Sequence, residues 1–217
     1  MKKLLGILIV ATTLISSTFA FSLSVGGRGL VGGRLDTIKN AGQDNGAGLS
    51  LGGGVNAHLE LFGGLGAQAE ANFVVNKLPA GNITLIDLPV MGWYQLDLFK
   101  DTIAIGFGIG PNFSNIFTDF SSLVKNMPGS TPNDVAAVDG KQTWNTGLAI
   151  GANFKIFFGE KRHFGVVLGA NAVFDFTSNE FFNALAAENK TNAFFGDSED
   201  GKRKEIYGTI GIEWRFF

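Results

Sequence analysis

Strict alternation of apolar with small or polar residues is the feature that most limits what this chain can fold into. Between residues 47 and 61, every odd-numbered position is apolar or small, whereas the even-numbered positions are small or polar and include Ser50, His58 and Glu60. Successive side chains of a β-strand point to opposite faces of a sheet, so a period of two predicts a strand with one apolar face. The apolar face of this segment consists of Ala47, Leu49, Leu51, Gly53, Val55, Ala57, Leu59 and Leu61.

The same alternation recurs along the rest of the chain and predicts eight strands in all. Each has at least the roughly 9 to 11 residues that a tilted strand needs to cross a lipid bilayer. The predicted strands span residues 21–34, 47–61, 65–75, 85–98, 102–113, 142–158, 164–176 and 204–217.

The connections between these strands alternate between long and short. Short connections are predicted at 62–64, at Lys100-Asp101 and at 159–163, and long ones at 35–46, 76–84, 114–141 and 177–203. Outer-membrane barrels show this asymmetry, because their periplasmic turns are short and their extracellular loops are long. We therefore predict an all-β fold, an eight-stranded antiparallel up-and-down transmembrane β-barrel, and we expect it to be a monomer.

A soluble β-sandwich or lipocalin-like barrel also alternates and is the alternative fold. It would bury the apolar faces and expose Glu60, Glu70 and Asp97, together with many of the 31 glycines. Soluble exteriors carry more lysine than these segments do. Of the 217 residues 21 are Phe, and aromatic residues fall near both ends of the predicted strands. Such girdles favour a barrel in a membrane.

The first twenty residues predict the compartment. Two lysines precede an apolar stretch at 4–15, which is followed by a short, mostly small and polar run that ends at Ala20. This order is that of a secretory signal peptide, and the apolar core is shorter than the about 20 residues of a membrane-spanning helix. The chain has no cysteine, which excludes a lipoprotein signal. We predict a signal peptide at 1–20 and one outer-membrane β-barrel domain at 21–217, exported to the outer membrane of a bacterium with two membranes.

Three segments resemble the small OmpA/OmpX-like outer-membrane β-barrel superfamily. Residues 86–94 (IDLPVMGWY) and 103–113 (IAIGFGIGPNF) resemble consecutive strands of such barrels, and residues 212–217 (IEWRFF) resemble their C-terminal β-signal. The resemblance implies the same fold, and recognition of the last strand by the outer-membrane assembly machinery. The chain departs from the pattern at Phe217, which follows the last outward residue, Phe216. Small barrels serve many roles, so the resemblance implies little about activity.

Pro89 and Pro111 fall on neighbouring predicted strands, diagonally near each other. Proline has no N–H group to donate, and a closed barrel has no edge strand on which to place it. We therefore predict a bulge or a weakened hydrogen-bond ladder around these two residues.

Charged residues on the inward faces form the main candidate site. The lumen of an eight-stranded barrel is just wide enough for side chains to fill it, so we expect a satisfied network of ion pairs and hydrogen bonds. The alternative is a narrow polar pathway, or a lumen that opens laterally, for small or hydrophobic solutes. The layer near the short turns would hold Glu60, Lys155, Glu213 and Arg215. The candidate lumen residues are Arg28, His58, Glu60, Glu70, Asp87, Asp97, Lys155, Asp175, Glu213 and Arg215.

The sequence offers little for catalysis or cofactor binding. The motif GxGxxG at 27–32 lies inside a predicted strand with no helix after it, which argues against a dinucleotide site. His58 lies roughly 26 Å along its strand from Ser50, and His163 lies in a short turn. Without cysteine, the chain has no thiolate metal site. Its net charge of −2 becomes more negative when the signal peptide is removed, which argues against a basic face for nucleic acid. We expect no enzyme activity, no cofactor and no bound metal.

The two longest predicted loops carry aromatic residues that would face the cell exterior. Such residues favour contact with an extracellular ligand, a host protein or lipopolysaccharide headgroups. The alternative is that they fold over the barrel mouth and pack on each other. The candidate residues are Phe117, Phe120, Phe181, Phe182, Phe194 and Phe195. We predict an outer-membrane barrel with a filled or narrow polar lumen and a structural or surface-interaction role, with a narrow channel as the alternative.

Overall fold

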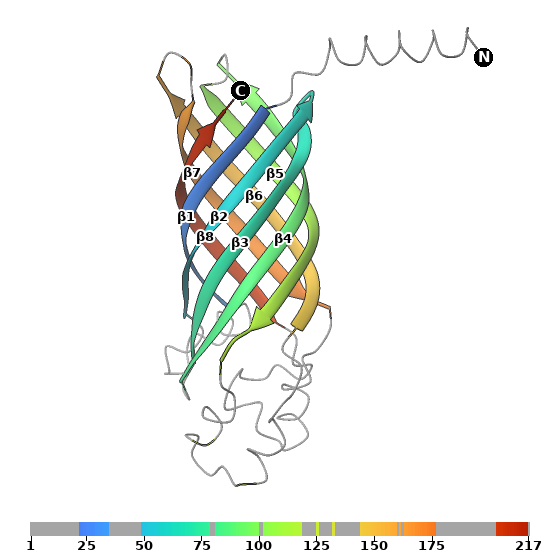
Figure 1. Cartoon of the computed structure of the whole chain (residues 1–217), viewed down its shortest axis with the longest axis vertical. Helices are drawn as coiled ribbons and strands as arrows, with labels where there is room; N and C mark the ends of the chain where they lie inside the picture. Colours follow the sequence, from blue (N-terminus) through green and yellow to red (C-terminus); the bar gives the residue numbers. More distant parts are fainter. Residues whose placement is uncertain are drawn as a thin grey trace, which may run out of the picture.

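Antiparallel strands close into a single barrel. The computed structural model describes residues 22–34, 49–78, 81–99, 102–118, 125, 132, 144–159, 161, 163–176 and 203–216. Their strands are β1 (Ser22–Arg34), β2 (Leu49–Phe62), β3 (Leu65–Leu78), β4 (Gly81–Leu98), β5 (Ile103–Ile116), β6 (Trp144–Phe158), β7 (Phe164–Asp175) and β8 (Lys204–Arg215). Each strand pairs with its neighbours in sequence, and β1 also pairs with β8 (Figure 1). The predicted eight-stranded up-and-down barrel is confirmed.

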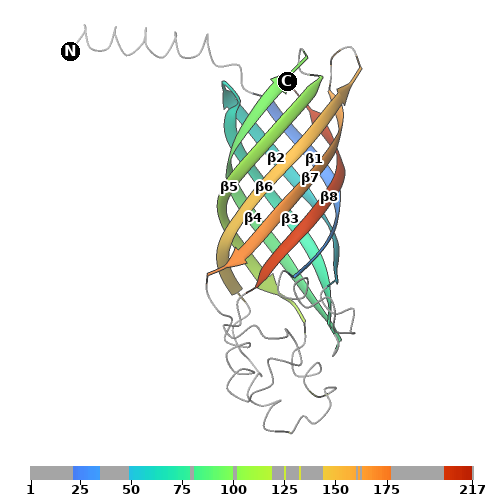
Figure 2. The same cartoon turned by 180° about the vertical axis from the view of Figure 1, so that it is seen from behind.

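The strands wrap around one cylinder with a common inclination (Figure 2). β1 begins and β8 ends at the same end of this cylinder, which is also the end of the short connections after β2, β4 and β6 (Figure 1). Within the described part of the chain, no helix is long and apolar enough to cross a membrane. The signal peptide predicted at 1–20 lies outside the described residues.

The predicted long loop at 76–84 is wrong. β3 continues to Leu78 and β4 starts at Gly81, and the two strands pair up to these ends. The alternation is weak in this segment because some inward positions, such as Ile83, are apolar and some outward ones, such as Lys77, are polar. β5 likewise runs to Ile116 instead of ending at residue 113. The buried apolar residues at this end are Val74, Ile83, Leu85 and Ile116.

The short connection after β2 is a two-residue turn rather than the predicted three-residue loop. Phe62 pairs with Leu65, and Gly63 and Gly64 both have positive φ, 56° and 81°. Two-residue hairpin turns favour positive φ at both central positions, and glycine adopts it without steric cost. The strand register shifts between Glu60 and Phe62, directly before the turn.

The barrel is apolar outside and polar inside. The outward side chains of Val55 and Ile210 are 61% and 62% exposed, whereas the inward Lys155 and Glu205 are 0% exposed. A water-soluble protein has the opposite distribution, because it rarely buries lysine or glutamate and rarely exposes a large apolar surface. Lipid favours an apolar exterior, and a closed barrel satisfies its backbone hydrogen bonds without water. The structure is therefore a transmembrane β-barrel, and the soluble alternative is wrong.

The hydrogen-bond ladder is interrupted around the two prolines, as predicted. Towards β5, the pairing of β4 passes from Pro89 directly to Gly92, opposite the segment that contains Pro111. Towards β3, the pairing passes from Asp87 directly to Val90. The register is the same before and after each gap, so the ladder is weakened without a bulge.

Glycines on the inward faces of β5 and β6 make room for the indole of Trp93. A Cβ atom at Gly106 would lie 2.4 Å from Trp93 Nε1, and one at Gly108 would lie 2.3 Å from Trp93 Cε3. A Cβ atom at Gly151 would lie 3.0 Å from the same ring. Larger residues at these positions would clash with Trp93. The glycine-rich sequence of β5 therefore allows a large side chain from β4 to lie across the lumen.

We expect Gly108→Val to destabilise the barrel by about 1–3 kcal/mol, because the added side chain overpacks the lumen against Trp93. The matched control is Gly92→Val, at an outward position where a Cβ atom would be 3.8 Å from its nearest neighbour. Valine suits a strand, so the control should be neutral or slightly stabilised. Urea unfolding in lipid vesicles, followed by tryptophan fluorescence, gives both free energies. Equal values for the two variants would contradict the packing of Trp93 against β5.

Candidate functional site

The structure places every charged residue that was predicted to face inward inside the lumen. Four of them are half-buried, namely Arg28, Glu60, Asp97 and Arg215. The buried members are His58, Glu70, Asp87, Lys155, Asp175 and Glu213. Together with neighbouring polar side chains they form an outer, a central and an inner cluster, of which the inner one lies at the end of the short connections.

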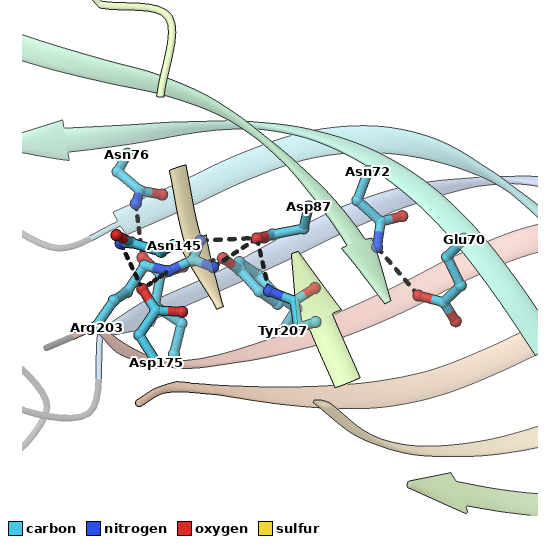
Figure 3. Close-up of polar contacts among 10 residues, drawn as sticks. Glu70, Asn72, Asn76, Asp87, Asn145, Asp175, Arg203 and Tyr207 are labelled. Atoms are coloured by element: carbon cyan, nitrogen blue, oxygen red, sulfur yellow. Dashed lines mark hydrogen bonds and ion pairs between the residues drawn. The ribbon is translucent and has the colours of Figure 1, made fainter. Parts of the chain in front are cut away.

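The outer cluster is built around the guanidinium of Arg203. It contacts both carboxylate oxygens of Asp87, at 2.5 Å from Nη2 and 3.1 Å from Nη1. Nε donates to Asp175 at 3.3 Å, and Nη1 donates to Glu205 at 3.2 Å. Figure 3 shows the Arg203 side chain reaching towards Asp87 and Asp175, which come from β4 and β7. One cation thus joins carboxylates on three strands.

Amide groups complete the hydrogen bonding of these carboxylates. The donors are Asn112 to Asp87 at 3.2 Å, Asn145 to Asp175 at 3.1 Å and Asn76 to Glu205 at 2.6 Å. The hydroxyl of Tyr207 also donates to Glu205. Because these residues come from every strand between β3 and β8, the outer cluster cross-links most of the barrel wall at this end.

The outer cluster is held together as a unit. Arg203 is 4% exposed, and Asp87 and Glu205 are buried as completely. Charges in a low-dielectric interior are stable only when each is paired and hydrogen-bonded. Removing one partner leaves an uncompensated buried charge, which costs more than the pair itself contributes. Loss of Arg203 would leave the largest number of charges in this cluster without a partner of opposite charge.

The central cluster consists of Arg28, Glu70 and three amide side chains. Arg28 forms an ion pair with Glu70 and donates to Asn72 Oδ1 at 3.1 Å. Glu70 also accepts from Gln68 at 2.6 Å and from Asn171 at 2.9 Å. Asn171 belongs to β7, which lies opposite β3 in the strand order of the barrel. These contacts therefore cross the full width of the lumen.

An apolar layer lies in the lumen beside these polar groups. Trp93, Met91 and Ala149 form a buried apolar cluster. The ring of His58 meets Trp93 edge-on, with 6.2 Å between ring centroids. Along β4, Trp93 lies between Asp87 of the outer cluster and the short connection to β5. The indole therefore lies in the lumen between its two ends.

The inner cluster contains the most deeply buried ion pair of the described residues. Lys155 Nζ lies 2.8 Å from Glu213 Oε1, and both side chains are buried. Arg215 lies 3.7 Å from Asp97, and its guanidinium covers the ring of Phe157 at 4.1 Å from the ring centroid. These contacts join β4, β6 and β8 near the short connections.

Gln95 extends the inner cluster to β2. It donates to Asp97 at 3.0 Å and to Glu60 at 3.4 Å. The four residues of the predicted layer thus lie at this end of the lumen, in two separate sets of contacts. These residues are Glu60, Lys155, Glu213 and Arg215.

Little empty space remains between the central and inner clusters. A cavity of about 10 Å³ lies between them, with Arg28, Gln68 and Glu213 in its lining. This is room for about one water molecule. The buried atoms Trp93 Nε1 and His58 Nε2 have no hydrogen-bond partner in the described part of the chain. Side chains of the central and inner clusters and the indole of Trp93 line this cavity.

The sequence reasoning missed Arg203, the residue with the most ion-pair partners in the outer cluster. Arg203 lies at the last position of the predicted loop 177–203 and was assigned to that loop. The alternation of inward and outward positions, here called parity, could have identified it. The inward residues of β8 are odd-numbered, and Arg203 lies two residues before the first of them, Glu205. The same parity points to two further residues that were not singled out, Glu205 and Tyr207.

Neither histidine is arranged with a catalytic partner in the described part of the chain. His58 contacts Trp93, and His163 Nδ1 lies 2.7 Å from the main-chain oxygen of Arg215. Among the described residues, no group of His, Cys, Asp and Glu has the arrangement of a metal site. The motif at 27–32 lies within β1 and forms no loop that could hold a phosphate.

One of the candidate loop aromatics is described by the structure. Phe117 directly follows β5 and is 60% exposed. The other candidates lie outside the described residues, namely Phe120, Phe181, Phe182, Phe194 and Phe195. Their role stays a prediction.

Solved membrane barrels are similar to this chain, whereas no family model and no curated protein sequence matches it. The outer membrane protein OprG of Pseudomonas aeruginosa is 13% identical, with a TM-score of 0.47 over 90% of this chain and 95% of that one. Neisserial surface protein A is 9% identical, with a TM-score of 0.49 over 90% and 97% of the two chains. The N-terminal β-barrel domain of P. aeruginosa OprF is 11% identical, with a TM-score of 0.41 over 89% and 97%.

We expect Arg203→Met to lower the free energy of unfolding by about 3–5 kcal/mol, because it leaves buried carboxylates without their shared cation. The matched control is Lys77→Met, since Lys77 is exposed on β3. Its effect should stay within about 0.5 kcal/mol. Urea unfolding in lipid vesicles measures both. If the two variants were equally stable, Arg203 would not be the residue that holds the outer cluster together.

Proposed function

We propose that this chain is an outer-membrane barrel with a lumen closed to ions and solutes, which serves the structure of the envelope or interactions at the cell surface. The observation that carries the proposal is the outer cluster, in which Arg203 joins Asp87, Asp175 and Glu205 across the lumen. A barrel built to conduct would leave water between its charged walls, whereas here the charges pair with each other.

The two other clusters support the same conclusion. The Arg28–Glu70 and Lys155–Glu213 ion pairs pair inward charges at two further levels of the lumen. Trp93 adds a large apolar side chain between the two ends. An eight-stranded barrel has room for little more than its own side chains, so pairing at three levels is sufficient to fill it.

A surface role would be carried by the end of the barrel opposite the short connections. With the short connections on the periplasmic side, as in outer-membrane barrels, this end faces the cell exterior. Three connections there are long in sequence, at 35–48, 117–143 and 176–203. Phe117, exposed where β5 ends, supports contact of this region with an extracellular ligand, a protein or lipopolysaccharide.

The proposal includes the absence of enzymatic activity. Its support is that the two histidines make contacts that suit structural roles, one with an aromatic ring and one with a main-chain oxygen. The proposal also includes insertion of the last strand by the outer-membrane assembly machinery. Its support is that two aromatic side chains face outward at the C-terminal end, Trp214 in β8 and Phe216 directly after it.

Planar-bilayer recordings test whether the lumen is closed. We expect the refolded wild-type barrel to be electrically silent, because the three clusters leave no continuous water path. Folding is checked by the shift in gel mobility on heating, and insertion by recovery of the folded protein from the same membranes. Discrete and reproducible conductance steps from the wild type would overturn the proposal in favour of a narrow channel for small or hydrophobic solutes.

Export by a signal peptide makes a second prediction. We expect the protein recovered from the outer membrane to begin at Phe21, because cleavage after Ala20 follows the small and polar run of a signal peptide. Intact-mass measurement of the purified barrel decides this. A mass that includes residues 1–20 in membrane-inserted protein would show that the segment is retained.

A further inference from the structure

The outer wall of the barrel carries an apolar groove that the lumen does not explain. Its volume is about 640 Å³, and it crosses β7, β8, β1, β2 and β3, lined mostly by outward residues and also by the inward residues Asn56, Glu70 and Glu213. In a transmembrane barrel this face meets lipid, so the groove opens towards acyl chains rather than towards water. The lining includes Phe164, Trp214, Val25, Ala57 and Ala69.

These lining residues form one continuous row of cross-strand neighbours. Phe164 pairs with Trp214, and Trp214 pairs with Val25. Val25 pairs with Ala57, which in turn pairs with Ala69. Phe164 and Trp214 lie at the ends of their strands next to the short connections, whereas Ala57 and Ala69 lie further into the wall. The groove therefore runs obliquely from the periplasmic rim towards the middle of the membrane.

The length of the row matches one leaflet of a bilayer. Four steps between neighbouring strands make a path of roughly 19 Å. Strands tilted by about 45° give a row that rises by roughly 13 Å along the membrane normal, close to half of the about 30 Å hydrocarbon core. An acyl chain anchored at the periplasmic rim would thus end near the bilayer midplane.

Small outward residues make the hollow. Ala57 and Ala69 follow Val25 along the row, on β2 and β3, and Gly27 lies two residues beyond Val25 on β1. A Cβ atom at Gly27 would have no neighbouring atom within 4 Å, so the space beside it is open. A flexible chain can fill such a space with dispersion contacts that a flat wall does not offer.

The periplasmic end of the groove is suited to a phosphate. The ring of His163 stacks on Trp214, with 6.0 Å between centroids and 11° between planes. Lys161 is exposed in the same short connection between β6 and β7. Tryptophan marks the headgroup level of a membrane, and a lysine beside it attracts an anionic headgroup.

We propose that this groove binds one phospholipid of the periplasmic leaflet, with one acyl chain in the groove and the phosphate near Lys161 and His163. A second copy of this chain fits less well as the occupant. A symmetric dimer would place the groove of one copy against the groove of the other, and the space in both grooves would stay unfilled. Lipid tails are as apolar as the barrel wall, so the preference for this site comes from shape and from the headgroup rather than from burial of apolar surface.

The test uses the full barrel in detergent micelles and native mass spectrometry with added palmitoyl-oleoyl phosphatidylglycerol. We expect the wild type to retain one lipid. Gly27→Leu fills the groove and should reduce the one-lipid fraction about fivefold, and Lys161→Gln should act to a similar extent by removing the headgroup contact. The matched control is Gly208→Leu. Gly208 is an outward glycine outside the groove, where a Cβ atom would lie 3.6 Å from its nearest neighbour. This variant should bind like the wild type.

Equal lipid retention by Gly27→Leu and Gly208→Leu would overturn the proposal. A wild-type dimer that Gly27→Leu dissociates would also overturn it and would assign the groove to a second copy. Folding of each variant is checked by the shift in gel mobility on heating. If Gly27→Leu does not fold, Ala57→Leu fills the same row from β2 and is judged by the same outcomes.

Discussion

A strand that faces lipid on one side must place its polar side chains on the other, and the rest of this structure depends on that constraint. Inside the lumen there is little water to satisfy a buried charge, so the charges must satisfy one another. The Arg203 guanidinium does this for Asp87, Asp175 and Glu205 at once, with Asn and Tyr side chains on the remaining oxygens. The same contacts therefore join strands of the wall and pair the charges inside the lumen.

The sequence predicts the wall better than the lumen. Period-two alternation predicted all of the strands, because every outward position meets the same apolar solvent and the pattern is local. It failed at 76–84, where Ile83 is apolar and yet faces inward, as does Leu85 directly after this segment. The inward residues were also predicted by parity, but the pairing of Arg28 with Glu70 was not. Partners such as these are set by strand stagger around the barrel, which a single sequence does not reveal.

Glycine has opposite consequences on the two faces. Inward glycines such as Gly106 and Gly108 leave room for the indole of Trp93 inside the lumen. The outward Gly27 leaves space beside the wall, which contributes to the groove between β7 and β3. The high glycine content is therefore a consequence of close packing inside and of shape outside.

The sequence does not identify Arg203 as an inward residue, because it lies one residue before β8, in a segment that the sequence assigns to a loop.

Hydrogen exchange of the Trp93 indole is the most direct test of a closed lumen. Trp93 Nε1 is buried and has no acceptor in the described part of the chain, so its protection reports the exclusion of water alone. Trp144 serves as the reference, because it is the outward first residue of β6 and a tryptophan at a strand end lies at the headgroup level, within reach of water. After transfer to D₂O, the account predicts that the Trp93 indole signal persists in NMR spectra long after that of Trp144 has disappeared. Exchange of both indoles at the same rate would mean that water fills the lumen and would contradict the account.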